Sequence, residues 1–290
     1  MYEVKDVSTW ECRGFLKGTR DKNDVKDPDT GEFYMFKYPA EYGGQKNGDI
    51  WAEKIATEIG KVLRIKVQES YLAIKDNEQG ILIKYSLNQK FEYLEEGATL
   101  LKAEFPAFRV SKKPFYIYDN IEFCLRKEEI NIEEFIDIIF FDCVIGNTDR
   151  HSENWGIIRN YANDTKRLIA AYDNGSSLGR EFHSEEDLST TDIKKYARNS
   201  RSCIRLVEGR NVNHYNFLIY VLKKYPNQKI KYFEKIKFLT EEKINEIVNQ
   251  IPDEFMPLNL KNFVIRLLLE RKRNILEILE GRGEKWLEWR

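Results

Sequence analysis

The sequence predicts an α+β fold in two lobes: a small β-rich lobe over residues 1–90 and a larger, mostly helical lobe over residues 91–290. Two observations lead to this prediction. Up to about residue 90, short apolar stretches alternate with turn signals, whereas from about residue 131 onward helical periodicity dominates. The chain of 290 residues is 42% hydrophobic and 13% aromatic, so it can bury a sizeable core as one large domain or as two lobes.

The small lobe contains four stretches that are typical of strands. They are "ECRGFLKGTRDKND", "GEFYMFKYP", "KVQESYLAI" and "GILIKYSL". Turn signals at "KDPDTG" and "KDNEQG" predict that these strands form two hairpins. Between the hairpins, "GDIWAEKIATEIGKVL" predicts a helix that begins at Asp49 as its N-cap and packs on the sheet. One face of this helix carries Ala52, Ile55, Ala56, Ile59 and Leu63.

The large lobe is predicted to form around a buried helix over residues 131–145, "NIEEFIDIIFFDCVI". It begins with an Asn-x-x-Glu capping box, is apolar almost all round, and is followed by Gly146, which suits a helix C-terminus. Further along, "NWGIIRN" and "KRLIAAYD" predict a hairpin closed by "YANDT". From Tyr215 onward, stretches such as "KNFVIRLLLERKRNILEILEG" predict amphipathic helices.

Composition excludes several classes of protein. The 47 basic and 48 acidic side chains nearly cancel, so the overall charge indicates neither a nucleic-acid nor a membrane partner. The four cysteines are scattered, which predicts free thiols in a reducing cytosol, and the three histidines do not fall at metal-ligand spacings. The chain shows no signal-peptide pattern and no apolar run near the roughly 18 residues of a membrane helix. We therefore expect a cytoplasmic protein.

The stretch "GNTDRHSENWGI" directly follows the predicted buried helix and concentrates polar side chains in one loop. Phosphoryl transfer requires a carboxylate that orients the attacking hydroxyl and oxygen ligands for magnesium. Asp149, Asn154 and Asp173 supply these groups, and the five-residue step from Asp149 to Asn154 reproduces the spacing of kinase catalytic loops. Each residue taken alone is also typical of a polar turn; the order and context of all three favour a catalytic site.

The sequence motif of this loop resembles that of the phosphatidylinositol kinases and, more closely, that of the bacterial HipA-like serine/threonine kinases. The second resemblance extends along most of the chain. "GTRDK" resembles the phosphate-binding loop of that family, "YMFKYP" its lysine strand, "DIWAEKIATEIGKV" the helix that carries the acidic partner of the lysine, and "YDNGSSLG" its second metal-binding loop. The resemblance implies a two-lobed protein-kinase-like fold and a kinase that uses ATP and Mg²⁺.

The resemblance also assigns roles to individual residues. Asp149 is expected to be the catalytic Asp, with His151 supporting its loop, and Asn154 and Asp173 are expected to hold magnesium. Lys37 is expected to contact the nucleotide phosphates and to pair with Glu53. The remaining candidates for nucleotide binding are Gly18, Thr19, Lys22 and Tyr85. Two alternatives stay open for the N-lobe residues: Lys37 is also compatible with a solvated edge of the sheet, and "GTRDK" with an ordinary turn.

The expected reaction is transfer of the γ-phosphate of ATP to a serine or threonine of a protein. Three other functions remain open: a lipid kinase, a nucleotide-binding pseudokinase that acts through a partner, and a kinase for small molecules. Because the chain starts almost at the phosphate loop, it is expected to lack the extra N-terminal subdomain of the longer HipA toxins, which leaves an antitoxin partner open. HipA-like kinases can phosphorylate their own phosphate loop, where this chain offers Thr19; Ser176, Ser177, Ser189, Thr190 and Thr191 are further candidates.

Overall fold

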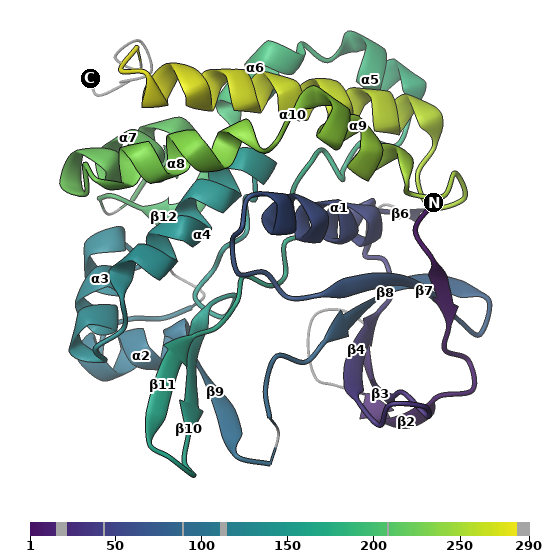
Figure 1. Ribbon diagram of the computed structural model, residues 1–290, viewed down its shortest axis with the longest axis horizontal. Helices are drawn as coiled ribbons and strands as arrows, with labels where there is room; N and C mark the ends of the chain where they lie inside the picture. Colours follow the sequence, from purple (N-terminus) through teal and green to yellow (C-terminus); the bar gives the residue numbers. More distant parts are fainter. Residues whose placement is uncertain (16–21, 43, 89, 111–114, 208, 283–290) are drawn as a thin grey trace.

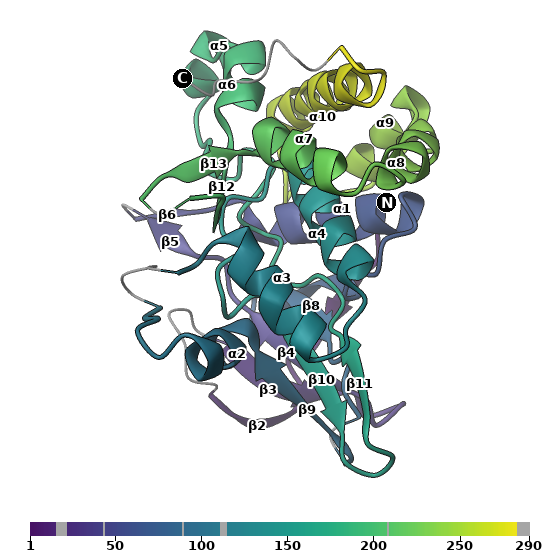
Figure 2. The same ribbon diagram turned by 90° about the vertical axis from the view of Figure 1, so that its left-hand side faces the viewer.

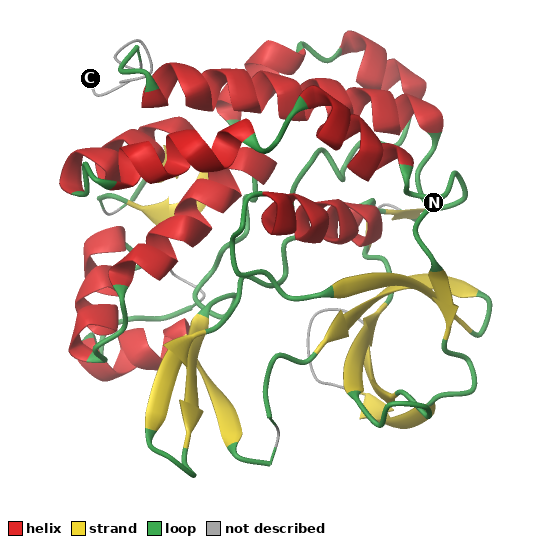
Figure 3. Cartoon of the chain, viewed as in Figure 1, coloured by secondary structure: helices red, strands yellow, loops and turns green. Residues whose placement is uncertain are grey.

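The computed structural model describes residues 1–15, 22–42, 44–88, 90–110, 115–207 and 209–282. A curled β-sheet with one helix beside it lies at one end, and most of the helices lie at the other (Figures 1 and 3). None of the helices in the described ranges is both long and apolar enough to cross a membrane. The four cysteines are free, as the sequence predicted.

The N-terminal sheet has six strands in the order β1-β7-β8-β4-β3-β2. The strands are β1 Val4–Asp6, β2 Glu11–Phe15, β3 Lys22–Lys26, β4 Phe33–Lys37, β7 Ser70–Lys75 and β8 Glu78–Lys84. The hairpins β3–β4 and β7–β8 are antiparallel and confirm the two hairpins predicted from the turn signals. Strand β1, which pairs in parallel with β7, was not predicted.

Strands β3 and β4 alternate strictly between the two faces of the sheet, which decides where the polar residues of this lobe lie. Tyr34 and Phe36 are buried in a small core on one face. Lys37 lies on the opposite face, directly across from Lys22 in the antiparallel register. The two lysines therefore stand side by side on one face of the sheet, because side chains at paired positions of a strand pair share a face.

Helix α1 Asp49–Val62 packs between this sheet and the helical lobe. The five apolar residues predicted on one face of this helix are all buried, with no exposed surface. The predicted N-cap was wrong. Gly48 occupies the N-cap position, and Asp49 is the first helical residue. Its carboxylate instead accepts a hydrogen bond from the Ala40 amide, which anchors the chain that leads into the helix.

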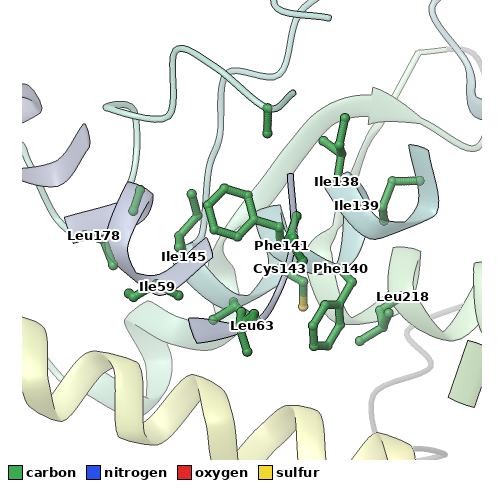
Figure 4. Close-up of a cluster of buried hydrophobic side chains, with 14 of the residues drawn as sticks. Ile59, Leu63, Ile138, Ile139, Phe140, Phe141, Cys143, Ile145, Leu178 and Leu218 are labelled. Carbon is green, nitrogen blue, oxygen red and sulfur yellow. The ribbon is translucent and has the colours of Figure 1, made fainter. Parts of the chain in front are cut away.

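The helical lobe contains nine helices in the described residues. They are α2 Gly97–Glu104, α3 Tyr118–Lys127, α4 Ile132–Ile145, α5 Glu185–Thr190, α6 Ile193–Asn199, α7 His214–Lys224, α8 Gln228–Lys237, α9 Glu241–Asn249 and α10 Leu258–Leu279. Helix α4 lies at the centre, and its side chains meet those of α1 and α7 in one continuous core (Figure 4). The Asn131 side chain accepts a hydrogen bond from the Glu133 amide at the start of α4, as expected for an N-cap.

Gly146 ends α4 with a φ of 71°, which confirms the predicted helix C-terminus. A Cβ at this position would lie 2.4 Å from the guanidinium carbon of Arg271, so glycine is required for both conformation and space. The chain therefore leaves the buried helix in a fixed direction, straight into the loop that carries Asp149.

Short strands complete the helical lobe. β9 Glu92–Glu96, β10 Gly156–Asn160 and β11 Thr165–Leu168 form an antiparallel sheet, β12 Arg201–Arg205 pairs with β13 Asn211–Asn213, and β5 Glu41–Tyr42 pairs with β6 Gln45–Lys46. The β10–β11 hairpin was predicted, but β9 was not. The lobe boundary that we propose at residue 90 falls between β8 and β9.

Candidate active site

The loop after α4 is held in one conformation by its own polar groups. The Asn147 amide oxygen accepts a hydrogen bond from the Asp149 backbone amide at 3.0 Å. The Asp149 carbonyl accepts from the His151 backbone amide and from the Asn154 side chain, both at 2.8 Å. The Asp149 side chain is half-buried. The loop thus presents this carboxylate at the surface of an otherwise fixed turn.

Asn154 is oriented by the same contact. Its Nδ2 donates to the Asp149 carbonyl, so the other end of the amide, Oδ1, is the end available as an oxygen ligand. The residue is 5% exposed. The five-residue spacing in the sequence therefore corresponds in the structure to a direct contact between the Asn154 side chain and the Asp149 backbone.

His151 contributes to the loop mainly through its backbone. Its amide donates to Asp149 and its carbonyl accepts from the Asn154 amide at 2.9 Å. Its ring nitrogen Nδ1 accepts a hydrogen bond from the Glu153 amide at 3.2 Å. This agrees with a supporting role for His151, and places the imidazole beside Glu153.

Asp173 lies in the loop that follows strand β11. It has a φ of 52°, a left-handed conformation that Asp tolerates better than most residues. Lys37 Nζ is 3.1 Å from its Oδ1. Lys37 and Asp173 come from different lobes and are 136 residues apart in the chain. The structure therefore brings strand β4 and the loop that carries Asp173 into direct contact.

Glu53 has a different partner from the one expected. Within the described residues no ion pair joins it to Lys37; its Oε1 accepts a hydrogen bond from Asn174 Nδ2 at 3.1 Å, and the Gly175 amide also donates to it. Glu53 is 3% exposed. Burial raises the pKa of its carboxyl, and the nearby charges of Lys37 and Arg150 act in the opposite direction.

Arg150 connects the two loops and was not identified from the sequence. It is fully buried, and its Nε and Nη2 bind both oxygens of Asp142 in α4, at 3.0 and 2.8 Å. Its Nη1 donates to the carbonyls of Asn154 and Tyr172, and its Nη2 donates to Asn174 Oδ1 at 2.6 Å. Burial raises the pKa of the Asp142 carboxyl against the opposing charge of Arg150.

A continuous chain of polar contacts thus runs from α4 to α1: Asp142, Arg150, Asn174 and Glu53. Because one guanidinium nitrogen binds the backbone of both candidate loops, Asn154 and the residue before Asp173 are held next to each other. An acid inside an almost entirely apolar helix was the one signal in the sequence that could have indicated this network.

Of the four remaining candidates for nucleotide binding, the structure describes two, Lys22 and Tyr85. Gly18 and Thr19 lie outside the described residues. Lys22 begins β3 opposite Lys37. Tyr85 follows β8, and its hydroxyl hydrogen-bonds to Asp24 on the same strand as Lys22. It also borders a cavity of about 490 Å³ with Phe33 and Leu87.

The sequence of this chain matches the pattern of a known protein family. Residues 14–256 match the HipA-like C-terminal domain. The chain belongs to this family. The serine/threonine-protein kinase CtkA of Helicobacter pylori is 25% identical to it over 280 residues, which cover 87% of this chain and 80% of that protein. The resemblance that the sequence motifs indicated is confirmed.

Two solved structures show the same fold as this HipA-like chain. The crystal structure of the Helicobacter pylori proinflammatory kinase CtkA has a TM-score of 0.80 at 20% identity and covers 99% of this chain and 100% of that one. HipA of Shewanella oneidensis, solved with HipB and operator DNA, has a TM-score of 0.60 at 12% identity, over 95% of this chain and 68% of that one. The predicted two-lobed kinase-like fold is therefore confirmed.

The candidate site offers oxygen ligands for a metal ion but no complete cage of acidic side chains in the described residues. In the described part of the chain, no group of three or more His, Cys, Asp or Glu side chains is placed to enclose an ion. Mg²⁺, however, is usually bound by one or two protein oxygens together with substrate phosphates and water. Asn154 Oδ1 and the Asp173 carboxylate form a donor set of this kind, so the residues fit a magnesium ion that is shared with a nucleotide.

Proposed function

We propose that this chain is a serine/threonine protein kinase that transfers the γ-phosphate of ATP, in the presence of Mg²⁺, to a hydroxyl group of a protein. The observation that supports it most is the Arg150 contact to both loops, because it holds the candidate base, Asp149, and the two candidate metal ligands in one place. The contact between Lys37 and Asp173 adds a cation at the same place.

The chemistry assigned to each residue follows from its position. The half-buried Asp149 carboxylate accepts a hydrogen bond from the acceptor hydroxyl and aligns its oxygen for attack. Asn154 and Asp173 would hold Mg²⁺, which neutralises charge on the phosphates when it is bound. Lys37 donates to the phosphate oxygens, and Lys22 extends the positive charge along the same face of the sheet.

Two further parts of the proposal concern the protein's surroundings. A cytoplasmic protein substrate is consistent with the free cysteines. Autophosphorylation is proposed at Thr19 or at the exposed Ser189 and Thr190. Ser176 and Ser177 are poorer candidates because they are only 7% and 4% exposed.

The test is an acceptor comparison with one enzyme preparation. The purified chain is incubated with γ-labelled ATP and Mg²⁺, and label is followed into Ser/Thr peptides, into phosphatidylinositol vesicles and into the chain itself. We expect label in the Ser/Thr peptides, and we expect it to be lost when Mg²⁺ is omitted or when Asp149→Asn replaces the wild type. Label in the vesicles alone would identify a lipid kinase. Nucleotide binding with no transfer to any acceptor would identify a pseudokinase.

A further inference from the structure

A polar cavity of about 400 Å³ lies directly beside the Asp149 loop. Its walls come from three places: Thr148 in the loop, Ser176 and Arg180 in the segment after Asp173, and Tyr196, Ser200 and Arg201 in and after α6. Helix α6 and the β12–β13 hairpin lie on the same side of the helical lobe (Figure 2). Because Thr148 precedes Asp149, the cavity begins about 3.8 Å along the chain from the candidate base.

Two arginines border this cavity without an acid to pair with. In the described part of the chain, neither Arg180 nor Arg201 forms an ion pair. Arg180 Nη1 is buried and lacks a hydrogen-bond acceptor among the described residues, and Arg201 Nη1 donates to the Asn211 carbonyl at 3.2 Å. Both arginines are partly buried, and a partly desolvated guanidinium without an acidic partner is stabilised by an anion.

The single carboxylate among the cavity's described wall residues is already engaged. Glu181 Oε1 accepts a hydrogen bond from the Tyr196 hydroxyl at 2.5 Å. Ser200 Oγ, by contrast, is buried and has no partner among the described residues. The cavity therefore offers donors in excess of acceptors, which is the chemistry of an anion-binding site.

The surrounding sequence strengthens the positive charge. Residues 193–207, which run through α6 and β12, contain five basic and no acidic side chains. The acidic residues of α5 do not border the cavity, and one of them, Glu185, accepts a hydrogen bond from Asn259 at the start of α10. This run, which lies between Asp192 and Glu208, therefore carries a local excess of positive charge although the whole chain is close to neutral.

We propose that this cavity binds a phosphorylated side chain of the protein substrate, with Asp or Glu as a weaker substitute, and so selects acceptors next to such a group. The proposal rests on the proposed kinase function and names its substrate class. Arg180 and Arg201 supply planar donors that match phosphate oxygens, and the buried Ser200 hydroxyl, which has no partner among the described residues, adds to them. An extended peptide rises about 3.3 Å per residue, so the phosphate belongs within about three residues of the acceptor.

The experiment uses peptides with one acceptor serine and a second position that carries phosphoserine, Glu or Ala. This position is moved from four residues before the acceptor to four residues after it. The enzyme is first treated with phosphatase, which is then removed, so that no phosphate on the chain itself occupies the cavity. We expect phosphoserine within three residues to raise kcat/KM at least about tenfold over Ala, mainly through KM.

Variants distinguish specific phosphate binding in the cavity from nonspecific attraction by positive charge on the surface. Arg180→Gln and Arg201→Gln should each bring the phosphoserine-to-Ala ratio of kcat/KM down toward one, and Arg180→Lys should recover part of it. Lys194→Gln, an exposed residue of α6 that does not border the cavity, should keep the wild-type ratio. Arg180→Gln should unfold no earlier than the wild type, since its guanidinium forms no ion pair in the described structure.

Two outcomes distinguish failure of the inference from failure of the proposed function. Equal kcat/KM for phosphoserine and Ala peptides at every position overturns the cavity's role but leaves the kinase function intact. An equal loss of the ratio in Lys194→Gln and Arg180→Gln also overturns it, because general charge would then explain the preference. No transfer to any peptide, with nucleotide bound, overturns the kinase function itself.

Discussion

Replacing Arg150 with methionine removes the side chain that joins both candidate active-site loops to α4. Arg150 is fully buried, and the Asp142 side chain to which it binds is 5% exposed. The substitution leaves this carboxylate without its cation, which typically lowers the free energy of unfolding by about 3–5 kcal/mol. The carbonyls of Asn154 and Tyr172 lose a donor as well. At roughly 2–3 °C per kcal/mol for a chain of this size, Tm should fall by about 10 °C.

The assay is thermal and urea unfolding of the Arg150→Met variant, followed by circular dichroism. A matched control is Arg273→Met in α10, where the arginine is half-exposed and pairs with Glu270 three residues earlier. Because the Arg273 side chain is 50% exposed, this pair is screened by water and contributes about 1 kcal/mol, far less than a fully buried pair. Adding Asp142→Asn to Arg150→Met should recover part of the loss, because it removes the unpaired charge. If Arg150→Met unfolds within about 1 kcal/mol of the wild type, the assigned role of the network is wrong.

Three further predictions concern the site and its supports. Lys37→Arg should restore little of the activity lost in Lys37→Ala, because a planar fork does not replace a compact ammonium; steady-state kinetics with ATP check this, and full activity of the Arg variant would contradict it. Asn154→Ala and Asp173→Ala should each weaken nucleotide binding in Mg²⁺ but not in EDTA, as measured by calorimetry; equal affinities for all three proteins in Mg²⁺ would refute the metal assignment. Burial lowers the pKa of His214 from 6.5 to about 3, so the unfolded chain binds a proton that the folded chain does not, and stability falls as the pH drops from 7 toward 3. His214→Gln should reduce the loss of unfolding free energy between pH 7.5 and pH 5 by about 2 kcal/mol, and an unchanged pH dependence in urea titrations would count against this.

Local patterns in the sequence were sufficient for most of the fold. The turn signals located both N-terminal hairpins, and the apolar run ending at Gly146 located the central helix. Strand β9 was missed because "EYLEE" carries three acids and pairs only with β10, some 60 residues later in the chain. Its stability comes from that partner, and single-sequence periodicity does not report on distant partners.

The part of the candidate site that lies within one loop was predictable from the sequence. Asp149 and Asn154 are five residues apart, and the Asn154 side chain contacts the Asp149 backbone, so neighbours in the sequence are also neighbours in the structure. The Asp142–Arg150–Asn174–Glu53 chain was not predictable, because its members come from four separate segments and each is common in loops and helices. The partner of Glu53 was not predictable for the same reason. We expected Lys37, but a buried carboxylate binds the donors that tertiary packing brings to it, and here this donor is Asn174.

The central claim is that Asp149 orients the acceptor hydroxyl in a site that binds the nucleotide by other residues. The most direct measurement compares wild type with Asp149→Asn for Mg²⁺·ATP affinity and for single-turnover phosphoryl transfer to a Ser/Thr peptide. We predict similar affinity and a rate at least about 10²-fold lower, since a positioned acid–base group contributes that much. Transfer by Asp149→Asn within about threefold of the wild type would contradict the claim.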